Sequence, residues 1–244
     1  LFRLLADKAL INRMGFNNKG VQHAAAKLGK GKPKNLVIGG NIGKNTLTGN
    51  DKAVDDYLRC FDALYNNVDY FTVNVSCPNI KDMHLLQSQE ALGDILLRLT
   101  EARKLKTPYK PVFLKISPDL TFKQIDETIN LCKASGLDGI IATNTTTDRT
   151  CLNTDEYTIF NTGAGGLSGQ PLKNRSLEIV RYICKQTNNT LPVIGVGGIM
   201  EASDAIDMLK AGASLVQVYT GFIYDGPFLV RRINKAVARY LLQK

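Results

Sequence analysis

The feature that most constrains the fold is a regular alternation of short apolar runs with longer helical patterns. Six runs rich in β-branched residues each end in polar or glycine residues, and they lie at 35–41, 70–76, 111–117, 139–145, 191–198 and 214–221. Amphipathic stretches accompany them at 51–65, 89–105, 121–136, 176–186, 202–211 and 227–242. Near-continuous apolar strands that alternate with helices are typical of parallel strands covered on both faces.

Two architectures accommodate such units, an open doubly wound sheet and a closed (β/α)8 TIM barrel. All six runs carry polar residues at their C-terminal ends, as expected when one rim of a barrel carries the whole site. Glycine-rich turns also close the last two strands, where barrels commonly hold a phosphate. We therefore predict an α/β barrel over residues 1–244 as a single domain, with six strand-helix units visible and the first two strands expected upstream of Leu1.

Composition narrows the functional classes. Of the 244 residues, 44% are hydrophobic and 22% charged, which is ordinary for a globular protein with a sizeable core. The formal net charge of +9 is scattered rather than gathered into a stripe with aromatic residues, which argues against nucleic-acid binding. Five widely spaced cysteines without a CxxC pair indicate a reducing compartment, with neither disulfides nor a metal site.

Residues at the strand ends are the candidate site residues, because the C-terminal ends of barrel strands meet at one rim. They are Asn74, Lys115, Thr143, Asn144, Gly198 and Tyr219. Amide side chains both donate and accept hydrogen bonds, which suits a planar ligand with amide groups. A lysine that emerges from an apolar strand faces a carboxylate or an anionic ligand, or else extends into solvent. The glycine-rich segments 165–169 and 195–198 favour a phosphate held by backbone N–H groups, although such turns are as often structural.

Cys77 is the candidate general base. It follows the run at 70–76 and lies in a polar cluster between Asn74 and Asn79. The two histidines, His23 and His84, lie in a helical pattern and in a loop that do not suit catalysis. A free thiol has a pKa of about 8.5, and a polar or cationic site can shift this pKa toward neutrality so that the thiolate acts as a base. Without a Cys-His pair in the sequence pattern, proton abstraction is favoured over acyl transfer.

Eight motifs occur in the order found in dihydroorotate dehydrogenases, the flavin enzymes of pyrimidine synthesis, and the chain resembles this family along essentially its full length. The motifs are INRMGFNN, GGNIGKN, NVSCPN, LKISPDL, ATNTTTDR, GGLSGQPL, VIGVGGI and QVYTGFIYDGP. The resemblance is closest to the class 2, quinone-reducing branch. It implies an FMN-bearing (β/α)8 barrel that oxidises dihydroorotate to orotate in de novo UMP biosynthesis, with a quinone as electron acceptor.

The resemblance also assigns residues to the cofactor and the substrate. Positions that match the family's FMN contacts are Asn41, Asn74, Lys115, Thr143, Gly169, Gly198, Tyr219 and Thr220. Positions that match its substrate contacts are Asn12, Arg13, Met14, Gly15, Phe16, Asn74, Asn79, Asn144 and Thr145. In the implied mechanism Cys77 takes the proton from C5 of dihydroorotate while a hydride leaves C6 for the flavin, and Lys115 stabilises negative charge on the flavin.

The chain departs from the class 2 pattern in two ways. Class 2 members usually carry serine at the position of Cys77, and cysteine there is typical of class 1, so the electron acceptor stays open. The family's first two strands and the class 2 helical extension that binds quinone and membrane have no counterpart in these residues. The resemblance thus implies a longer working protein, cytoplasmic or peripheral on the cytoplasmic face of the membrane.

Two other interpretations stay open. A tRNA dihydrouridine synthase is also a basic flavin barrel with a catalytic cysteine, but it would need an RNA-binding appendage beyond the barrel. A non-catalytic, phosphate-binding remnant of the barrel is the alternative outside enzymes, although every polar rim residue is kept in the visible part.

Overall fold

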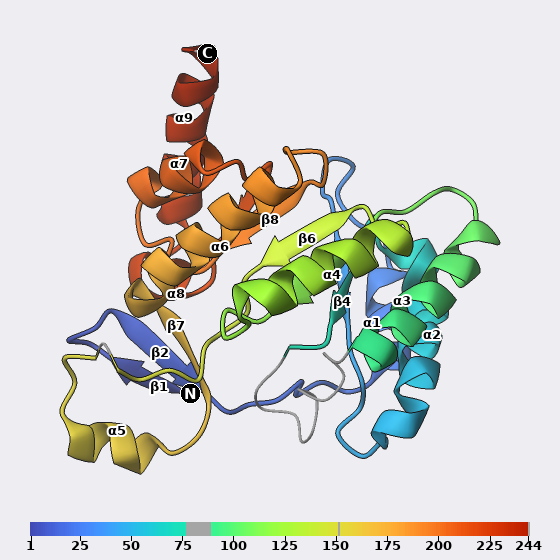
Figure 1. Cartoon of the computed structure of the whole chain (residues 1–244), viewed down its shortest axis with the longest axis horizontal. Helices are drawn as coiled ribbons and strands as arrows, with labels where there is room; N and C mark the ends of the chain where they lie inside the picture. The colour runs from blue at the N-terminus through green and yellow to red at the C-terminus, as the bar shows by residue number, and fades with distance from the viewer. Residues whose placement is uncertain (77–88, 151, 244) are drawn as a thin grey trace. The chain divides into compact units, whose positions relative to one another are not determined.

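The computed structural model describes residues 1–76, 89–150 and 152–243 (Figure 1). Its contacts divide the chain into two compact units, each of which alternates strands with helices. Unit 1 comprises Leu1–Met14, Ile116–Asp126 and Ile140–Lys244, and unit 2 comprises Gly15–Lys115 and Glu127–Gly139. In the described part of the chain, no helix combines the length and apolar character that crossing a membrane requires.

Unit 2 is built on parallel strands. The central strand β4 (Tyr70–Asn74) pairs in parallel with β3 (Gly39–Ile42) on one side and with β5 (Val112–Ile116) on the other. The helices of this part are α1 (Val21–Leu28), α2 (Ala53–Leu64) and α3 (Gln89–Lys104), with single 3-10 turns at η1 (Asn50–Lys52) and η2 (Tyr65–Asn67). The rings of Phe61 on α2 and Phe71 on β4 are fully buried, with centroids 4.6 Å apart. These aromatic contacts bind the helix layer to the strands.

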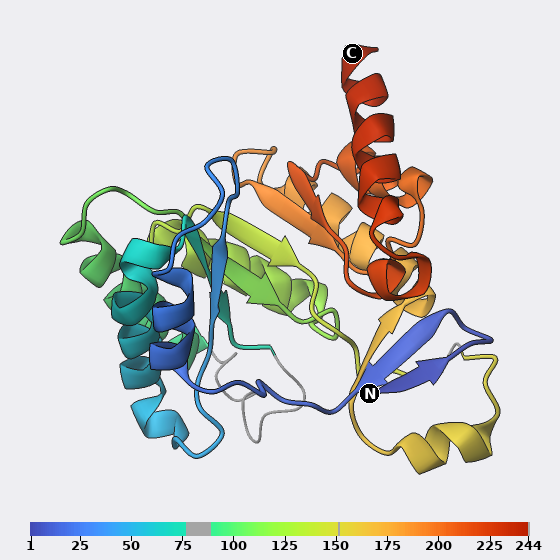
Figure 2. The same ribbon diagram turned by 180° about the vertical axis from the view of Figure 1, so that it is seen from behind.

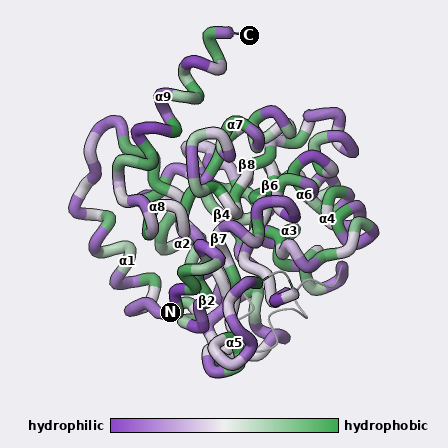
Figure 3. The backbone as a smooth tube through the Cα atoms, turned by 90° about the vertical axis from the view of Figure 1, so that its left-hand side faces the viewer, coloured by the Kyte–Doolittle hydropathy of each residue, from purple (hydrophilic) through white to green (hydrophobic). Residues whose placement is uncertain are grey.

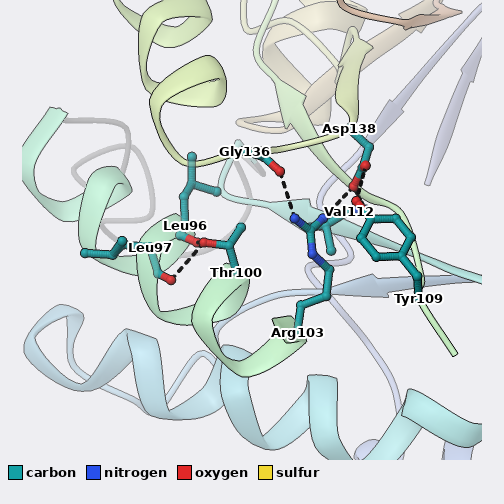
Figure 4. A network of polar contacts seen from close by, with 8 residues as sticks. All are labelled: Leu96, Leu97, Thr100, Arg103, Tyr109, Val112, Gly136 and Asp138. Atoms are coloured by element: carbon teal, nitrogen blue, oxygen red, sulfur yellow. Dashed lines mark hydrogen bonds and ion pairs between the residues drawn. The ribbon is translucent and has the colours of Figure 1, made fainter. Parts of the chain in front are cut away.

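A buried ion pair joins Arg103 on α3 to Asp138, the residue before strand β6 (Gly139–Ala142) (Figure 4). The guanidinium of Arg103 donates to the carboxylate of Asp138 and to the backbone oxygen of Gly136, the latter at 2.8 Å. The same carboxylate accepts from the backbone N–H of Val112 at 2.7 Å and from the hydroxyl of Tyr109. Burial and this hydrogen bond to Asp138 raise the pKa of Tyr109. The network aligns the start of β5 with α3.

Unit 1 contains the second set of parallel strands. Strand β8 (Val193–Val196) pairs in parallel with β6 (Gly139–Ala142) and with β9 (Leu215–Gln217). The helices that follow are α6 (Lys173–Gln186), entered through the 3-10 turn η4 (Gln170–Leu172), and then α7 (Ala202–Lys210), α8 (Thr220–Asp225) and α9 (Phe228–Leu242). Figure 3 shows hydrophilic and hydrophobic residues alternating along α9, as the amphipathic pattern of the sequence predicts.

A β-hairpin and a short helix in unit 1 were not foreseen from the sequence. Strand β1 (Phe2–Leu4) pairs antiparallel with β2 (Ala9–Asn12), and β2 pairs antiparallel with β7 (Gly166–Gly169), as Figure 2 shows from behind. The short helix α5 (Glu156–Thr162) precedes β7. In the hairpin turn the buried carboxylate of Asp7 accepts hydrogen bonds from the backbone N–H groups of Asn153 and Thr154, at 2.6 and 3.0 Å. The hairpin is thereby fastened to a segment far away in the sequence.

The predicted elements otherwise match the structure closely, except at two runs predicted as strands. The run at 214–221 is strand only at Leu215–Gln217, and its last two residues begin the unforeseen helix α8. Helix α4 (Phe122–Ala134) begins where the sequence indicates, because the Thr121 hydroxyl accepts from the Gln124 N–H at 3.3 Å while Gln124 accepts from the Thr121 N–H at 2.9 Å. The run predicted as a strand at 35–41 becomes strand only from Gly39. Its partner strand begins at Tyr70, which lies opposite Gly39, so the residues before Gly39 have no β4 residue opposite them.

Candidate active site

The predicted site residues fall into two sets, one in each unit, and each set is described by itself. Cys77 and Asn79 lie outside the described residues. The set in unit 2 consists of Gly15, Phe16, Asn41, Asn74 and Lys115. The set in unit 1 consists of Asn12, Arg13, Met14, Thr143, Asn144, Thr145, Gly169, Gly198, Tyr219 and Thr220.

Three strand-end side chains of unit 2 lie on one face of its strands. Asn74 on β4 is paired directly with Lys115 on β5, and Asn41 on β3 is paired with Thr72. Side chains alternate between the two faces of a strand, so Thr72 and Asn74 point to the same side, and the register carries that side to Asn41 and Lys115. Two amides and one ammonium group therefore share a face at the C-terminal ends of parallel strands.

Asn74 is held rigidly in this row. Its side chain is 4% exposed, and its Oδ1 accepts from the backbone N–H of Ser76 at 3.3 Å. The hydroxyl of Tyr57 donates to the Asn74 backbone oxygen at 2.9 Å, and the hydroxyl of Ser76 donates to the Lys115 backbone oxygen at 3.0 Å. These bonds set the orientation of the Asn74 amide before any ligand binds.

Phe16 lies at the same strand ends because Gly43, which no sequence pattern indicated as a site residue, leaves room for its ring. A Cβ atom at Gly43 would lie 2.5 Å from the Phe16 ring and 3.4 Å from the Asn74 backbone oxygen. Only glycine lets the ring pack this closely against the loop after β3. The next residue, Lys44, is 4% exposed and donates to the Thr48 backbone oxygen at 2.6 Å, which ties the same loop down.

In unit 1 the residues after β6 are fixed from both sides. The Thr143 N–H donates to the Val196 backbone oxygen at 2.7 Å, and the Thr143 hydroxyl shares a hydrogen bond with the Ser176 hydroxyl of α6 at 3.0 Å. The Asn144 N–H donates to the Ile116 backbone oxygen at 2.8 Å, and its Oδ1 accepts from the Thr145 N–H at 2.9 Å. The structure therefore brings Thr143, Asn144 and Thr145 together on one ordered turn.

Three glycines of unit 1 lie too close to neighbouring parts of the chain to carry side chains. A Cβ atom at Gly198, where φ is +70°, would lie 2.3 Å from the Lys173 Cα, and one at Gly169, where φ is +103°, would lie 3.0 Å from Thr220 Cγ2. The Thr220 hydroxyl donates to the Ser168 hydroxyl at 2.8 Å, and a Cβ atom at Gly221 would meet the Ile199 backbone oxygen at 2.3 Å. Gly169 at the end of β7 thus packs closely against Thr220 at the start of α8, and Gly198 after β8 packs against the start of α6, while the Tyr219 side chain is exposed.

Asn12 and Arg13 lie at the end of the hairpin strand β2. The Asn12 amide donates to the Gly166 backbone oxygen at 3.4 Å, and the Arg13 guanidinium lies 5.0 Å from the centre of the Phe2 ring. Met14 is exposed, at 46%. The pairing of β2 with β7 thus connects Asn12 to the strand that ends in Gly169, a link of more than 150 residues that no local pattern indicates.

The residues present fit FMN in both sets. A ring system edged by carbonyl oxygens and N–H groups calls for donors and acceptors together, which Asn41, Asn74 and Lys115 supply on one face. A phosphate is held by backbone N–H groups, and Gly169 and Gly198, both at positive φ, lie in the glycine-rich segments that can offer such groups. The two sets, each taken by itself, therefore carry groups of the kinds that a flavin ring and a phosphate require.

Comparison with known proteins defines the class. The profile described as dihydroorotate dehydrogenase matches residues 1–241, and the chain belongs to this family of oxidoreductases, whose members are typically flavin-dependent. Within the family the chain is similar to the quinone type. It is 48% identical to the dihydroorotate dehydrogenase (quinone) of Christiangramia forsetii, over 97% of this chain and 68% of that protein. It is 47% identical to that of Gloeobacter violaceus, over 99% of this chain and 66% of that protein.

A solved structure confirms the fold class. The ligand-free dihydroorotate dehydrogenase of Eimeria tenella superposes with a TM-score of 0.91 at 34% identity, covering 99% of this chain and 72% of that one. The prediction of an α/β fold related to the TIM barrel is confirmed, and so is the prediction of a quinone-type dihydroorotate dehydrogenase. The chain spans about two thirds of the length of these curated relatives. The single-domain prediction and the individual site residues stay predictions.

Proposed function

We propose that the protein oxidises dihydroorotate to orotate with FMN as its resident cofactor and passes the electrons to a quinone. The observation that carries the proposal is the shared face of Asn41, Asn74 and Lys115, which offers amides and a cation at the ends of parallel strands. FMN, when bound, accepts the hydride that leaves C6 of the substrate. The name of the similar protein from Christiangramia forsetii supports the quinone as acceptor.

The cofactor and substrate are assigned to separate groups of residues. FMN would be held by Asn41, Asn74, Lys115, Thr143, Gly169, Gly198, Tyr219 and Thr220. The substrate would be held by Asn12, Arg13, Met14, Gly15, Phe16, Asn74, Asn79, Asn144 and Thr145. Amide side chains match a pyrimidine that has both carbonyl oxygens and ring N–H groups, because each amide donates and accepts. Lys115 contributes a positive charge where negative charge gathers during the reaction.

Cys77 is assigned as the base that removes the proton from C5 of dihydroorotate. The proton on C5 passes to the thiolate, and the electron pair of that C–H bond forms a double bond between C5 and C6. The hydrogen on C6 leaves with its electron pair as a hydride. A thiol ionises more readily than the serine usual in class 2 relatives. We expect Cys77→Ser to retain flavin and measurable activity with a higher pH optimum. An unchanged rate and pH profile in Cys77→Ala would remove this residue from the mechanism.

A visible spectrum of the purified full-length protein tests the function directly. Bound flavin that bleaches when dihydroorotate is added under anaerobic conditions is the expected result. Comparing a quinone, fumarate and NAD as oxidants in the same cuvette then identifies the acceptor, and the quinone should restore the flavin colour fastest. A colourless protein, or flavin that dihydroorotate leaves unbleached, would contradict the proposal. Localisation in the cytoplasm or on the cytoplasmic face of the membrane stays a prediction.

A further inference from the structure

The loop after β5 makes contacts that neither the fold nor the proposed substrate set explains. It runs from Ser117 to Leu120, and its acidic residue, Asp119, is an exposed side chain on the surface of unit 1. A carboxylate in this position is free to extend into solvent. Instead it turns toward the residues that follow β6, which carry the proposed substrate contacts Asn144 and Thr145.

Asp119 accepts three hydrogen bonds from two consecutive threonines. Its Oδ1 accepts from the hydroxyl of Thr146, and its Oδ2 accepts from both the N–H and the hydroxyl of Thr147, each at 2.9 Å. Hydrogen bonds to an ionised acceptor are stronger than those between neutral groups. The carboxylate thus holds the backbone immediately after Asn144 and Thr145 through Thr146 and Thr147.

The loop that carries Asp119 is itself anchored. Arg175 on α6 donates to the backbone oxygens of Pro118 and Leu120, at 3.0 and 2.7 Å, so both neighbours of Asp119 are bound to the helix. The Asp119 N–H also donates to the Ser117 hydroxyl at 3.1 Å. The backbone that carries the Asp119 carboxylate is therefore held in place by hydrogen bonds on both sides. Ser176, one residue after Arg175, shares the hydrogen bond with Thr143 and steadies the other end of the segment.

The backbone at Thr146, here called the Thr146 segment, is also hydrogen-bonded to β7 and to the guanidinium of Arg149. Thr146 exchanges backbone hydrogen bonds with Leu167, at 3.1 and 2.7 Å. Arg149 donates to the Thr146 backbone oxygen at 3.2 Å and to the backbone oxygen of Gly165, just before β7. Because β7 also pairs with β2, these hydrogen bonds connect Thr146 through β7 to the strand that ends in Asn12.

We propose that Asp119 is a positioning residue that sets Asn144 and Thr145 for the carbonyl and N–H groups of a pyrimidine such as orotate. The inference rests on the proposed function, since it assigns a role toward that substrate. Asp119 touches neither substrate nor cofactor in this scheme. Asp119 restricts the conformations of Asn144 and Thr145 before the ligand binds. Without it, ordering these two residues on binding would cost conformational entropy and so weaken the affinity for the ligand.

The test compares Asp119→Ala and Asp119→Asn with wild type in the full-length, FMN-loaded protein. Asp126→Asn is the matched control, because Asp126 also accepts from a hydroxyl of unit 1, that of Tyr182 at 2.9 and 3.0 Å, but lies on α4. We expect Asp119→Ala to raise the orotate dissociation constant about tenfold, since hydrogen bonds to a charged group are lost. Asp119→Asn keeps one acceptor oxygen and should raise it about threefold. Asp126→Asn should leave it unchanged.

Three readouts separate positioning from a general loss of structure. Calorimetry with orotate gives the dissociation constant, kinetics with dihydroorotate should show a raised KM with kcat nearly unchanged, and amide exchange at Thr147 should quicken in Asp119→Ala. Flavin content should stay at the wild-type level in all variants. An orotate dissociation constant within twofold of wild type in Asp119→Ala would overturn this assignment alone. Failure of the wild-type protein to bind orotate would overturn the proposed function, and this assignment with it.

Discussion

Replacing Gly198 by alanine gives a sharp test of the glycine cradle, because the structure sets the size of the effect. The backbone φ of +70° is one that residues with a Cβ atom adopt at a cost of about 1 kcal/mol. The new Cβ atom would also lie 2.3 Å from the Lys173 Cα and 2.5 Å from the Lys173 N, both of which belong to the start of α6. This clash can be relieved only if the backbone moves, and we expect that movement to cost about a further 2 kcal/mol.

Gly136 provides the matched control for this variant. Its φ of +67° is nearly the same, but a Cβ atom there would meet nothing within 4 Å. Gly136→Ala should therefore cost about 1 kcal/mol of unfolding free energy and leave FMN affinity unchanged. If Gly198→Ala relieves its clash by displacing the loop, the additional 2 kcal/mol or so appears as a rise of about 30-fold in the FMN dissociation constant.

The assay is fluorescence titration of the apoprotein with FMN, together with urea unfolding of both variants. The expected pattern is weak flavin binding in Gly198→Ala and wild-type binding in Gly136→Ala. Equal FMN affinity in the two variants would refute the reasoning, because it would mean that the close approach of the loop to α6 has no bearing on the cofactor. Equal unfolding free energies would show that the backbone contact at Lys173 is relieved without cost.

Two further predictions concern stability. Asp138→Ala should lower the unfolding free energy by about 3 kcal/mol, because it leaves the Arg103 guanidinium, which is 8% exposed, without its carboxylate partner. Arg103→Met should lower it by about half as much, since Asp138 still accepts from the Val112 N–H and the Tyr109 hydroxyl. Urea unfolding that gave the reverse order of the two variants would contradict this prediction. Burial raises the pKa of Asp7, but hydrogen bonds from Thr154 and Asn153 outweigh it and hold that pKa below its usual value, so the stabilisation is present above about pH 4 and is lost as the pH falls through the folded-state pKa. The difference in unfolding free energy between wild type and Asp7→Asn should accordingly shrink on acidification, and a difference independent of pH would be at odds with the assignment.

The sequence was a good guide to elements whose signals are local. The amphipathic helices at 89–105 and 202–211 were located to within a residue. The stretch at 121–136 begins at Thr121, which forms a reciprocal cap with Gln124 three residues later. Cys132 lies in the apolar pattern of the helix predicted at 121–136, and its burial raises the pKa of its thiol to about 12. In each case the information lies within a few neighbouring residues, where hydrophobic period and capping chemistry operate.

The candidate site was only partly accessible in this way. Strand-end positions such as Asn74 and Lys115 could be named because a strand delivers its last side chains to a predictable edge. The sequence did not indicate Gly43, Ser176 or Asp119, although Gly43 and Asp119 stand in quoted motifs, because neither a small or acidic residue in a loop nor a serine on a helix has a pattern that reveals its partner. Their partners are Phe16, Thr143 and the Thr146 segment, which lie 27 or more residues away.

By itself, then, the sequence determined the alternation of strands and helices, the polar ends of the strands and the family to which the chain belongs. Only the tertiary structure decided that β2 pairs with β7, that the run at 35–41 becomes strand at Gly39, and that Asp119 reaches the residues after β6. The physical reason is one of range. Periodicity and capping are properties of adjacent residues, whereas strand pairing and side-chain hydrogen bonds depend on which distant groups folding brings within about 3 Å of one another.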